Sequence, residues 1–302
     1  MAGGKKKGAQ SRGRIIQHYV VNLLVRALIG SAMALPYGWR VPLVGWIVKR
    51  LVAPLARYRR RSLRHLALIW PELPLAERRR IADAVSDNAG RTLIENYSTR
   101  DLIRRMADVT PEGPGYAALC AARDAGQPVI LVSGHFGNYE AARALLVGRG
   151  FPIGGLYRPM RNSYFNAHYA ETMKAFGGPV FAQGRQGMGG FLRHLKEGGM
   201  MVLLFDQKAG TDWIDFLGRP ARTAVSAAEL ALRYGALLIP FYATRQADGL
   251  SFRVELEAPV TASDPLQMTK DITRSLERRV IADPGQWFWV HHRWGKLPRK
   301  TG

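Results

Sequence analysis

From Pro128 onward, short apolar runs alternate with amphipathic segments, and this alternation constrains the fold more than any other feature of the chain. Segments of roughly 10–15 residues with helical character separate the runs, so the predicted strands need crossover connections and pair in parallel. A later segment, "LSFRVELEAPV", predicts an antiparallel strand, and residues 265–282 predict a closing helix. The predicted fold is α/β, with a mixed, mainly parallel sheet flanked by helices. The apolar runs read "VILVS", "IGGLY", "MMVLLF" and "LLIPFYATR".

The first 71 residues differ sharply from the rest of the chain in charge. They contain 14 Lys and Arg residues and no acidic residue, so they account for 14 of the 21 excess positive charges. Two apolar stretches, residues 19–36 and 41–56, lie among these charges. We expect a helical pair that dips into or lies on the inner leaflet, with Tyr37, Trp39 and Trp46 at the membrane interface. The alternative is an ordinary two-helix cap on a soluble domain.

This distribution predicts three parts: a basic disordered tail over residues 1–14, a membrane-associating helical segment over 15–66, and an α/β domain over 67–302. Because the charge is concentrated at one end, we expect an anionic membrane surface as partner and no nucleic acid. A single cysteine, Cys120, excludes an internal disulfide framework and a zinc site built from several cysteines. We expect no metal and no cofactor.

The stretch "SGHFGNYE" follows the first predicted strand and places His135 and Glu140 five positions apart. In sheets of this kind, ligands bind beyond the carboxyl ends of the strands. Glu140 falls in the first turn of the next helix, where it can reach back to one imidazole nitrogen and leave the other free as a general base. In the alternative interpretation, Glu140 only complements the helix dipole and His135 is a turn residue.

Two further polar clusters follow predicted strands and are expected to face the same cleft. "LYRPMRN" supplies Arg158, Arg161 and Asn162, and guanidinium groups suit phosphate or carboxylate oxygens. "FDQKAG" supplies Asp206 and Lys208 at the end of the strongest apolar run, "MMVLLF". An acid at this position can anchor an arginine or a substrate hydroxyl, or it can simply start a turn. We take all five as candidate substrate-binding residues.

Taken in order along the chain, these blocks resemble the bacterial lipid A lauroyl/myristoyl acyltransferases of the lysophospholipid acyltransferase superfamily. "SGHFGNYE" is similar to that family's His-x4-acid motif, and "YRPMRN" to its arginine-proline-asparagine block. The resemblance covers most of the chain and implies a glycerol-3-phosphate acyltransferase-like fold. Three further segments carry it: "DQKAG" with "DFLGRPARTAVSAAELALRYGALLIP", "QWFWVHHRWGK", and "RRSLRHLALIWPELPLAERRRIA".

The resemblance implies transfer of a fatty acyl chain from acyl carrier protein, as co-substrate, to a hydroxyl of a lipid A precursor. The reaction would take place at the cytoplasmic face of the bacterial inner membrane, with an anionic glycolipid as acceptor. His135 would deprotonate the acceptor hydroxyl and Glu140 would orient His135. Arg158, with Asp206 ordering the site, would engage substrate phosphate or stabilise the oxyanion.

Three other functions remain open from the sequence. The acceptor can be another anionic lipid, such as a lysophospholipid or a phosphatidylinositol mannoside, because relatives that acylate those lipids share the motif. The same histidine and acid can instead activate water for thioester hydrolysis. Finally, the basic N-terminal part can make the protein a non-catalytic membrane or nucleic-acid binder.

Overall fold

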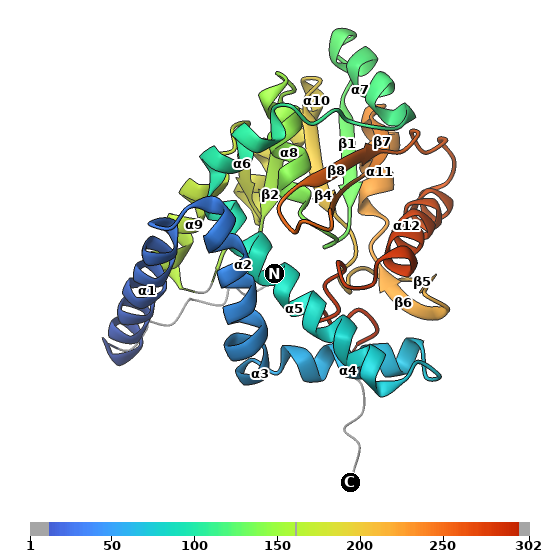
Figure 1. The fold of residues 1–302 in the computed structure, drawn as a ribbon. Coiled ribbons are helices and arrows are strands. Elements are labelled where there is room, and N and C mark those ends of the chain that lie inside the picture. Colours follow the sequence, from blue (N-terminus) through green and yellow to red (C-terminus); the bar gives the residue numbers. More distant parts are fainter. Residues whose placement is uncertain (1–11, 161, 296–302) are drawn as a thin grey trace.

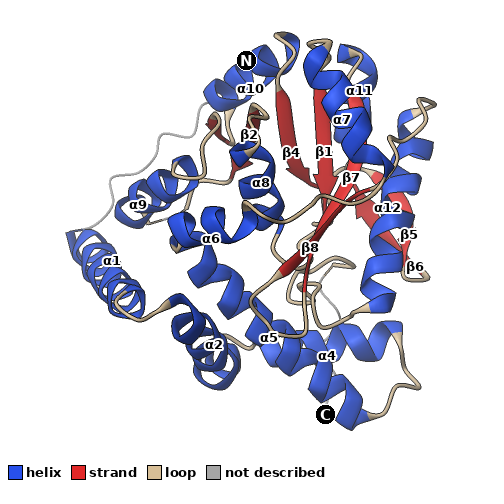
Figure 2. Cartoon of the chain, turned by 45° about the horizontal axis from the view of Figure 1, so that its top comes forward, coloured by secondary structure: helices blue, strands red, loops and turns tan. Residues whose placement is uncertain are grey.

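The computed structural model describes residues 12–160 and 162–295, and it confirms the predicted α/β class. A six-stranded sheet with the order β3-β2-β4-β1-β7-β8 forms the centre of the molecule (Figures 1 and 2). Its neighbouring strands are parallel except for β7 and β8, which pair antiparallel as predicted. The strands are β1 Val129–Ser133, β2 Ile153–Tyr157, β3 Val180–Ala182, β4 Met200–Leu204, β7 Leu237–Arg245 and β8 Phe252–Leu256.

Helices cover both faces of this sheet, because the side chains of each central strand alternate between two apolar cores. In β1, Val129 and Leu131 pack into the core under α6, α7 and α8. Ile130 and Val132 pack into the other core, which α10, α11, α12 and the C-terminal tryptophans complete. The helices are α6 Thr99–Met106, α7 Pro114–Asp124, α8 Tyr139–Gly148, α9 Ser163–Lys174, α10 Arg185–Lys196, α11 Ser226–Tyr234 and α12 Pro265–Ala282.

A small hairpin, β5 Asp212–Phe216 with β6 Arg219–Thr223, forms a separate two-stranded sheet that the sequence did not predict. Ile214, Phe216 and Ala221 point inward, while the alternate residue Trp213 is exposed. The hairpin connects the end of β4 to α11 and lies beside α12 (Figure 1).

The N-terminal part consists of successive helices that pack around α5. The second apolar stretch of the sequence packs against α5 so closely that a Cβ at Gly90 would lie 2.7 Å from the carbonyl oxygen of Val44. Tyr37 is buried, so its expected place at a membrane interface is wrong, whereas Trp39 and Trp46 are exposed. The elements are α1 Arg12–Met33, α2 Tyr37–Ile47, the π-helical turn η1 Val48–Val52, α3 Ala53–Leu55, α4 Tyr58–Ile69 and α5 Leu75–Tyr97.

Helix α1 lies at the edge of the molecule, away from the sheet (Figures 1 and 2). Its segment Ile15–Met33 has 19 residues, a mean hydropathy of 1.3 in its most apolar window, and only 6% of that window is buried. At about 1.5 Å per residue, such a helix is long enough to reach across a hydrocarbon core of about 30 Å. By length and composition, it is the one candidate membrane span among the described residues.

Candidate active site

His135 lies two residues after β1, in a turn that neighbouring segments hold through its backbone. Its carbonyl oxygen accepts a hydrogen bond from the amide of Phe288 (2.9 Å), and the amide of Gly137 donates to the carbonyl of Gln286 (3.1 Å). Gly137 has φ +56°, and a Cβ there would lie 2.0 Å from the carbonyl oxygen of Ala243. A glycine is therefore required for β7 to approach the turn this closely.

The carboxylate of Asp206 holds the imidazole of His135. The distance from Nδ1 of His135 to Oδ1 of Asp206 is 2.7 Å, and Oδ2 accepts from the backbone amide of His135 (2.8 Å) and from Nε1 of Trp287 (2.9 Å). Asp206 is fully buried. Burial opposes its ionisation, but the charge and hydrogen bonds of His135 outweigh burial and hold the pKa of Asp206 well below its ordinary value. The carboxylate is therefore ionised at neutral pH.

This contact assigns the tautomer of His135. An ionised carboxylate only accepts hydrogen bonds, so Nδ1 of His135 carries a proton, and in the neutral imidazole Nε2 carries the lone pair. The side-chain amide of Gln207 lies 3.5 Å from Nε2 and can donate to it. His135 and Gln207 both line a cavity of about 550 Å³ at the carboxyl edge of the sheet. Nε2 is therefore the proton-accepting atom of the site.

A second imidazole, that of His291, packs edge-on against His135. The two ring centroids are 4.4 Å apart. Burial, followed by the nearby charge of His135, lowers the pKa of His291 to about 4. His291 is therefore neutral near pH 7, so the ring beside the base adds no charge. The sequence did not indicate that His291 lies beside His135.

The side chain of Glu140 does not bind the partner that the sequence predicted. Asn138 caps α8 by accepting from the amide of Glu140 (3.1 Å), which places Glu140 in the first helical turn as expected. Its side chain, however, pairs with Arg143 one turn later, at 3.1 Å. Nδ1 of His135 is bound by Asp206 instead. Glu140 is buried and lines the same cavity, so the structure brings the two predicted residues together while giving them different partners.

Two of the predicted cationic residues lie at the cavity. Arg158 follows β2 and Lys208 follows β4, and both line the cavity together with His135. Both side chains are exposed, and neither forms an ion pair with another described residue. They are thus cations that a bound anion can reach. Arg161 lies outside the described residues.

Asn162 has structural contacts that the sequence did not indicate. Its side-chain oxygen accepts from the amides of Tyr164 (3.1 Å) and Phe165 (3.2 Å), so it caps α9. Its amide nitrogen donates to the carbonyl oxygen of His18 in α1, at 2.8 Å. These contacts fasten α9 to α1, and they place Asn162 as a helix cap where a substrate-binding residue was predicted.

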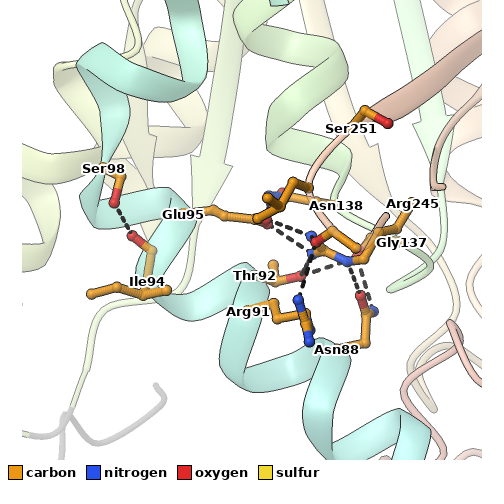
Figure 3. Close-up of polar contacts among 12 residues, drawn as sticks. Asn88, Arg91, Thr92, Ile94, Glu95, Ser98, Gly137, Asn138, Arg245 and Ser251 are labelled. Carbon is orange, nitrogen blue, oxygen red and sulfur yellow. Dashed lines mark hydrogen bonds and ion pairs between the residues drawn. The ribbon is translucent and has the colours of Figure 1, made fainter. Parts of the chain in front are cut away.

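Behind the turn that carries His135 lies a buried ion pair that the sequence did not predict (Figure 3). Glu95 of α5, which is fully buried, accepts from Arg245 (2.8 Å) and from the side chain of Asn138 (2.9 Å). Arg245 also donates to Asn88 (2.8 Å), whose own amide lies 3.3 Å from the carbonyl oxygen of Gly137. Thus α5 and the end of β7 hold the turn through charged groups. Residues 95 and 245 are far apart in sequence and carry no motif.

Within residues 12–160 and 162–295, no three His, Cys, Asp or Glu side chains lie together in a way that could hold a metal ion. Cys120, in α7, is partly buried and free. The expectation that no metal and no cofactor takes part stays a prediction.

The fold and the site define a class of protein. In this class, a histidine that is hydrogen-bonded to a carboxylate lines a cavity at the carboxyl edge of an α/β sheet. This geometry suits removal of a proton from a bound hydroxyl. The chain belongs to the bacterial lipid A biosynthesis acyltransferase family, whose sequence model matches residues 7–296.

Individual relatives are distant. The chain is 27% identical over 173 residues to a lipid A biosynthesis acyltransferase of Haemophilus influenzae, covering 56% of this chain and 54% of that protein. It is 23% identical over 186 residues to a phosphatidylinositol mannoside acyltransferase of Mycobacterium tuberculosis, covering 60% and 58%. A lipid A biosynthesis lauroyltransferase of Escherichia coli matches at 26% over 246 residues, covering 78% of each chain. The chain therefore spans little more than half of the first two relatives.

Proposed function

We propose that this protein transfers a fatty acyl chain from acyl carrier protein to a hydroxyl of a lipid A precursor, at the cytoplasmic face of the bacterial inner membrane. The observation that carries the proposal is the His135–Asp206 pair over the cavity, in a chain that belongs to the lipid A biosynthesis acyltransferase family. In this proposal Asp206 takes the orienting role that was predicted for Glu140.

In the proposed reaction, Nε2 of His135 removes the proton of the acceptor hydroxyl as its oxygen attacks the thioester carbonyl. The tetrahedral intermediate then expels the carrier thiolate, the carbon–sulfur bond breaks, and the imidazolium returns its proton to the sulfur. The carboxylate of Asp206 offsets the positive charge on His135 during this sequence. Neutral His291 supports the same role, because a second positive charge 4.4 Å away would disfavour the imidazolium.

Arg158 and Lys208 engage negative charge on a substrate in this proposal. Their exposure and lack of an ion pair with described residues support it, since both remain available to phosphate oxygens. The net charge of +21 favours both an acidic carrier protein and an anionic glycolipid.

Membrane attachment through α1 accounts for its exposed apolar surface. Trp39 and Trp46 of α2 are 71% and 50% exposed, and aromatic rings of this kind favour the interface between headgroups and acyl chains. We infer that α1 inserts into the bilayer while α2 lies against its surface.

The test uses purified full-length protein, acyl carrier protein loaded with C12, C14 or C16 chains, and a tetra-acylated lipid A precursor as acceptor. We expect a penta-acylated product by mass spectrometry that disappears in His135→Ala. Free fatty acid formed at the same rate with and without acceptor would instead identify a thioesterase. A product that survives His135→Ala would remove His135 from the reaction.

A second candidate acceptor is another anionic lipid, because the chain is also similar to phosphatidylinositol mannoside acyltransferases. A competition assay that supplies the lipid A precursor, a lysophospholipid and a phosphatidylinositol mannoside together distinguishes the lipid A acceptor from the other anionic lipids. We expect the lipid A precursor to be acylated first. Preference for either other lipid would keep the chemistry and change the acceptor.

A further inference from the structure

The sheet forks between β2 and β4 at its carboxyl edge. Pairing between these strands ends at Gly155 and Val202. Beyond that point, β2 continues to Tyr157 paired only with β3, and β4 continues to Leu204 paired with β1. The two strands therefore separate over their last two residues and leave a gap in the sheet.

The cavity beside His135 enters this gap. On β2 it is lined by residues 155–157, and on β4 by residues 202–204. Both ranges begin at the last paired position, Gly155 and Val202, so the cavity stops where the strands join. Apart from Gly155 and Tyr157, the lining residues of these two strands are aliphatic, and they form walls that suit a hydrocarbon chain.

Arg143 closes the inner end of the cavity on the α8 side. Its guanidinium is almost fully buried and donates to Glu140 (3.1 Å), to the carbonyl of Met173 (3.5 Å) and to the carbonyl of Gly177 (2.6 Å). Its Nε is buried and has no hydrogen-bond partner among the described residues. Displacing this group would leave Glu140 as an unpaired buried charge, so the end of the cavity resists movement.

The missing side chain of Gly155 sets how close a ligand can come to this end. A Cβ built on Gly155 would lie 3.6 Å from Cζ and 3.8 Å from Nε of Arg143, which is ordinary van der Waals contact. One methyl group therefore fits there without a clash, and it would take the volume of one carbon from the cavity. Met173 lines the same end from α9.

We propose that Gly155 and Arg143 form the end of the site for the transferred acyl chain and thereby set the longest chain that binds well. This inference rests on the proposed function for the identity of the chain, because a fatty acyl donor supplies the hydrocarbon. In this proposal the Glu140–Arg143 pair influences which chain length binds well, whereas Asp206 orients the imidazole of His135.

Two variants move this end in opposite directions. Gly155→Ala adds a methyl group inside the cavity, and Met173→Ala removes the end of a long side chain while keeping the backbone carbonyl that binds Arg143. Gly148→Ala is the matched control, because it adds the same methyl group to α8 where nothing lies within 4 Å. Arg143 is left in place, since its loss would unpair Glu140.

The first measurement is calorimetric binding of saturated fatty acids from C8 to C16 to the full-length protein. Affinity should rise about fourfold per added methylene, which corresponds to about 0.8 kcal/mol, and then stop rising at the length that fills the cavity. We expect this break to come one or two carbons earlier in Gly155→Ala and later in Met173→Ala, with Gly148→Ala like wild type. An unchanged break in both cavity variants would overturn the inference.

The second measurement compares rates of transfer from C10 to C16 acyl carrier proteins to the lipid A precursor in the same variants. We expect the preferred donor to change in the same direction as the binding break. If the chain length at which affinity stops rising shifts in the variants, but wild type transfers no acyl chain, the proposed function is refuted and the acyl-chain site is kept. Transfer with an unchanged donor preference in both variants would refute the chain site and keep the function.

Discussion

The two sides of His135 are built in opposite ways. Behind it, Asp206, Glu95 and Asn138 are fully buried, and each is bound by two or more hydrogen bonds. In front of it, Arg158 and Lys208 are exposed and form no ion pair with another described residue. The buried side is therefore complete once the protein has folded, whereas the cations of the exposed side gain a partner only when a substrate binds.

The energetics of buried charge explain this division. A buried carboxylate is stable only when hydrogen bonds and an opposite charge replace water, as Arg245 and Asn138 do for Glu95. Groups held this way keep the imidazole in one orientation. Exposed guanidinium and ammonium groups stay hydrated until an anion displaces the water, so they contribute to substrate binding and little to the folded state.

The largest effect should come from Asp206→Asn, which tests the buried side. An amide cannot stabilise the imidazolium or enforce the Nδ1–H tautomer, so we expect kcat to fall about 10³- to 10⁴-fold. Acyl transfer under saturating substrates measures this loss. Asp215→Asn, on the exposed face of β5, is the control and should be within twofold of wild type. A loss below tenfold in Asp206→Asn would show that Asp206 does not act on the base.

Glu95→Gln should be the next largest effect, and it acts on stability. It leaves Arg245 charged and buried without its carboxylate, which costs about 3–5 kcal/mol in the free energy of unfolding. Asp87→Asn on the same helix breaks the more exposed Asp87–Arg91 pair and should cost about 1 kcal/mol or less. Denaturant unfolding in detergent measures both values. Equal losses of unfolding free energy in the two variants would mean that burial does not increase the contribution of the Glu95–Arg245 pair to stability.

A pH effect of intermediate size should come from His291. Its folded pKa of about 4 lies below the ordinary value of about 6.5, so the folded state binds fewer protons than the unfolded state between these pH values. The stability contribution is complete above pH 6.5 and falls as the pH decreases toward 4, by about 2 kcal/mol between pH 7 and pH 5. We expect His291→Asn to lose less stability than wild type over this interval in thermal unfolding. Parallel pH profiles of the two proteins would refute a buried, neutral His291.

Arg158→Ala tests the exposed side and should have the smallest effect. We expect kcat/KM to fall about tenfold, equivalent to about 1.4 kcal/mol, while thermal stability stays within about 0.5 kcal/mol of wild type. Raising the salt concentration should shrink this difference, because exposed charges are screened. Measuring kcat/KM at low and high salt checks both statements. A large loss of stability would place Arg158 with the buried side.

The sequence predicted the parts of the fold that depend on local pattern. The predicted helix over residues 265–282 coincides with α12, and four predicted parallel strands lie in the sheet with β8 antiparallel at its edge. The β5–β6 hairpin was missed because charged residues in both strands, and Pro220 in β6, interrupt any apolar pattern. The position of His135 directly after a strand predicts a general base, and the structure places His135 beside the cavity.

The partners of charged residues were harder to predict, because they depend on strand order. Glu140 is close to His135 in the sequence, whereas Asp206 reaches it because β4 lies next to β1 in the sheet. Glu95 of α5 and Arg245 at the end of β7 form an ion pair although 150 residues separate them in the sequence (Figure 3). A sequence pattern shows that such residues follow strands, but only the order of the strands shows which ends are neighbours.

Nitrogen NMR of the protein labelled at its histidines tests whether Asp206 holds the Nδ1–H tautomer of His135. Assignment uses His135→Gln, and the comparison uses Asp206→Asn and Glu140→Gln. We expect a hydrogen-bonded proton on Nδ1 of His135 and an unprotonated Nε2 in the neutral imidazole, a pattern lost in Asp206→Asn and kept in Glu140→Gln. If Nε2 rather than Nδ1 carries the proton of the neutral imidazole in wild type, or if the tautomer changes only in Glu140→Gln, then Asp206 does not set the tautomer of His135.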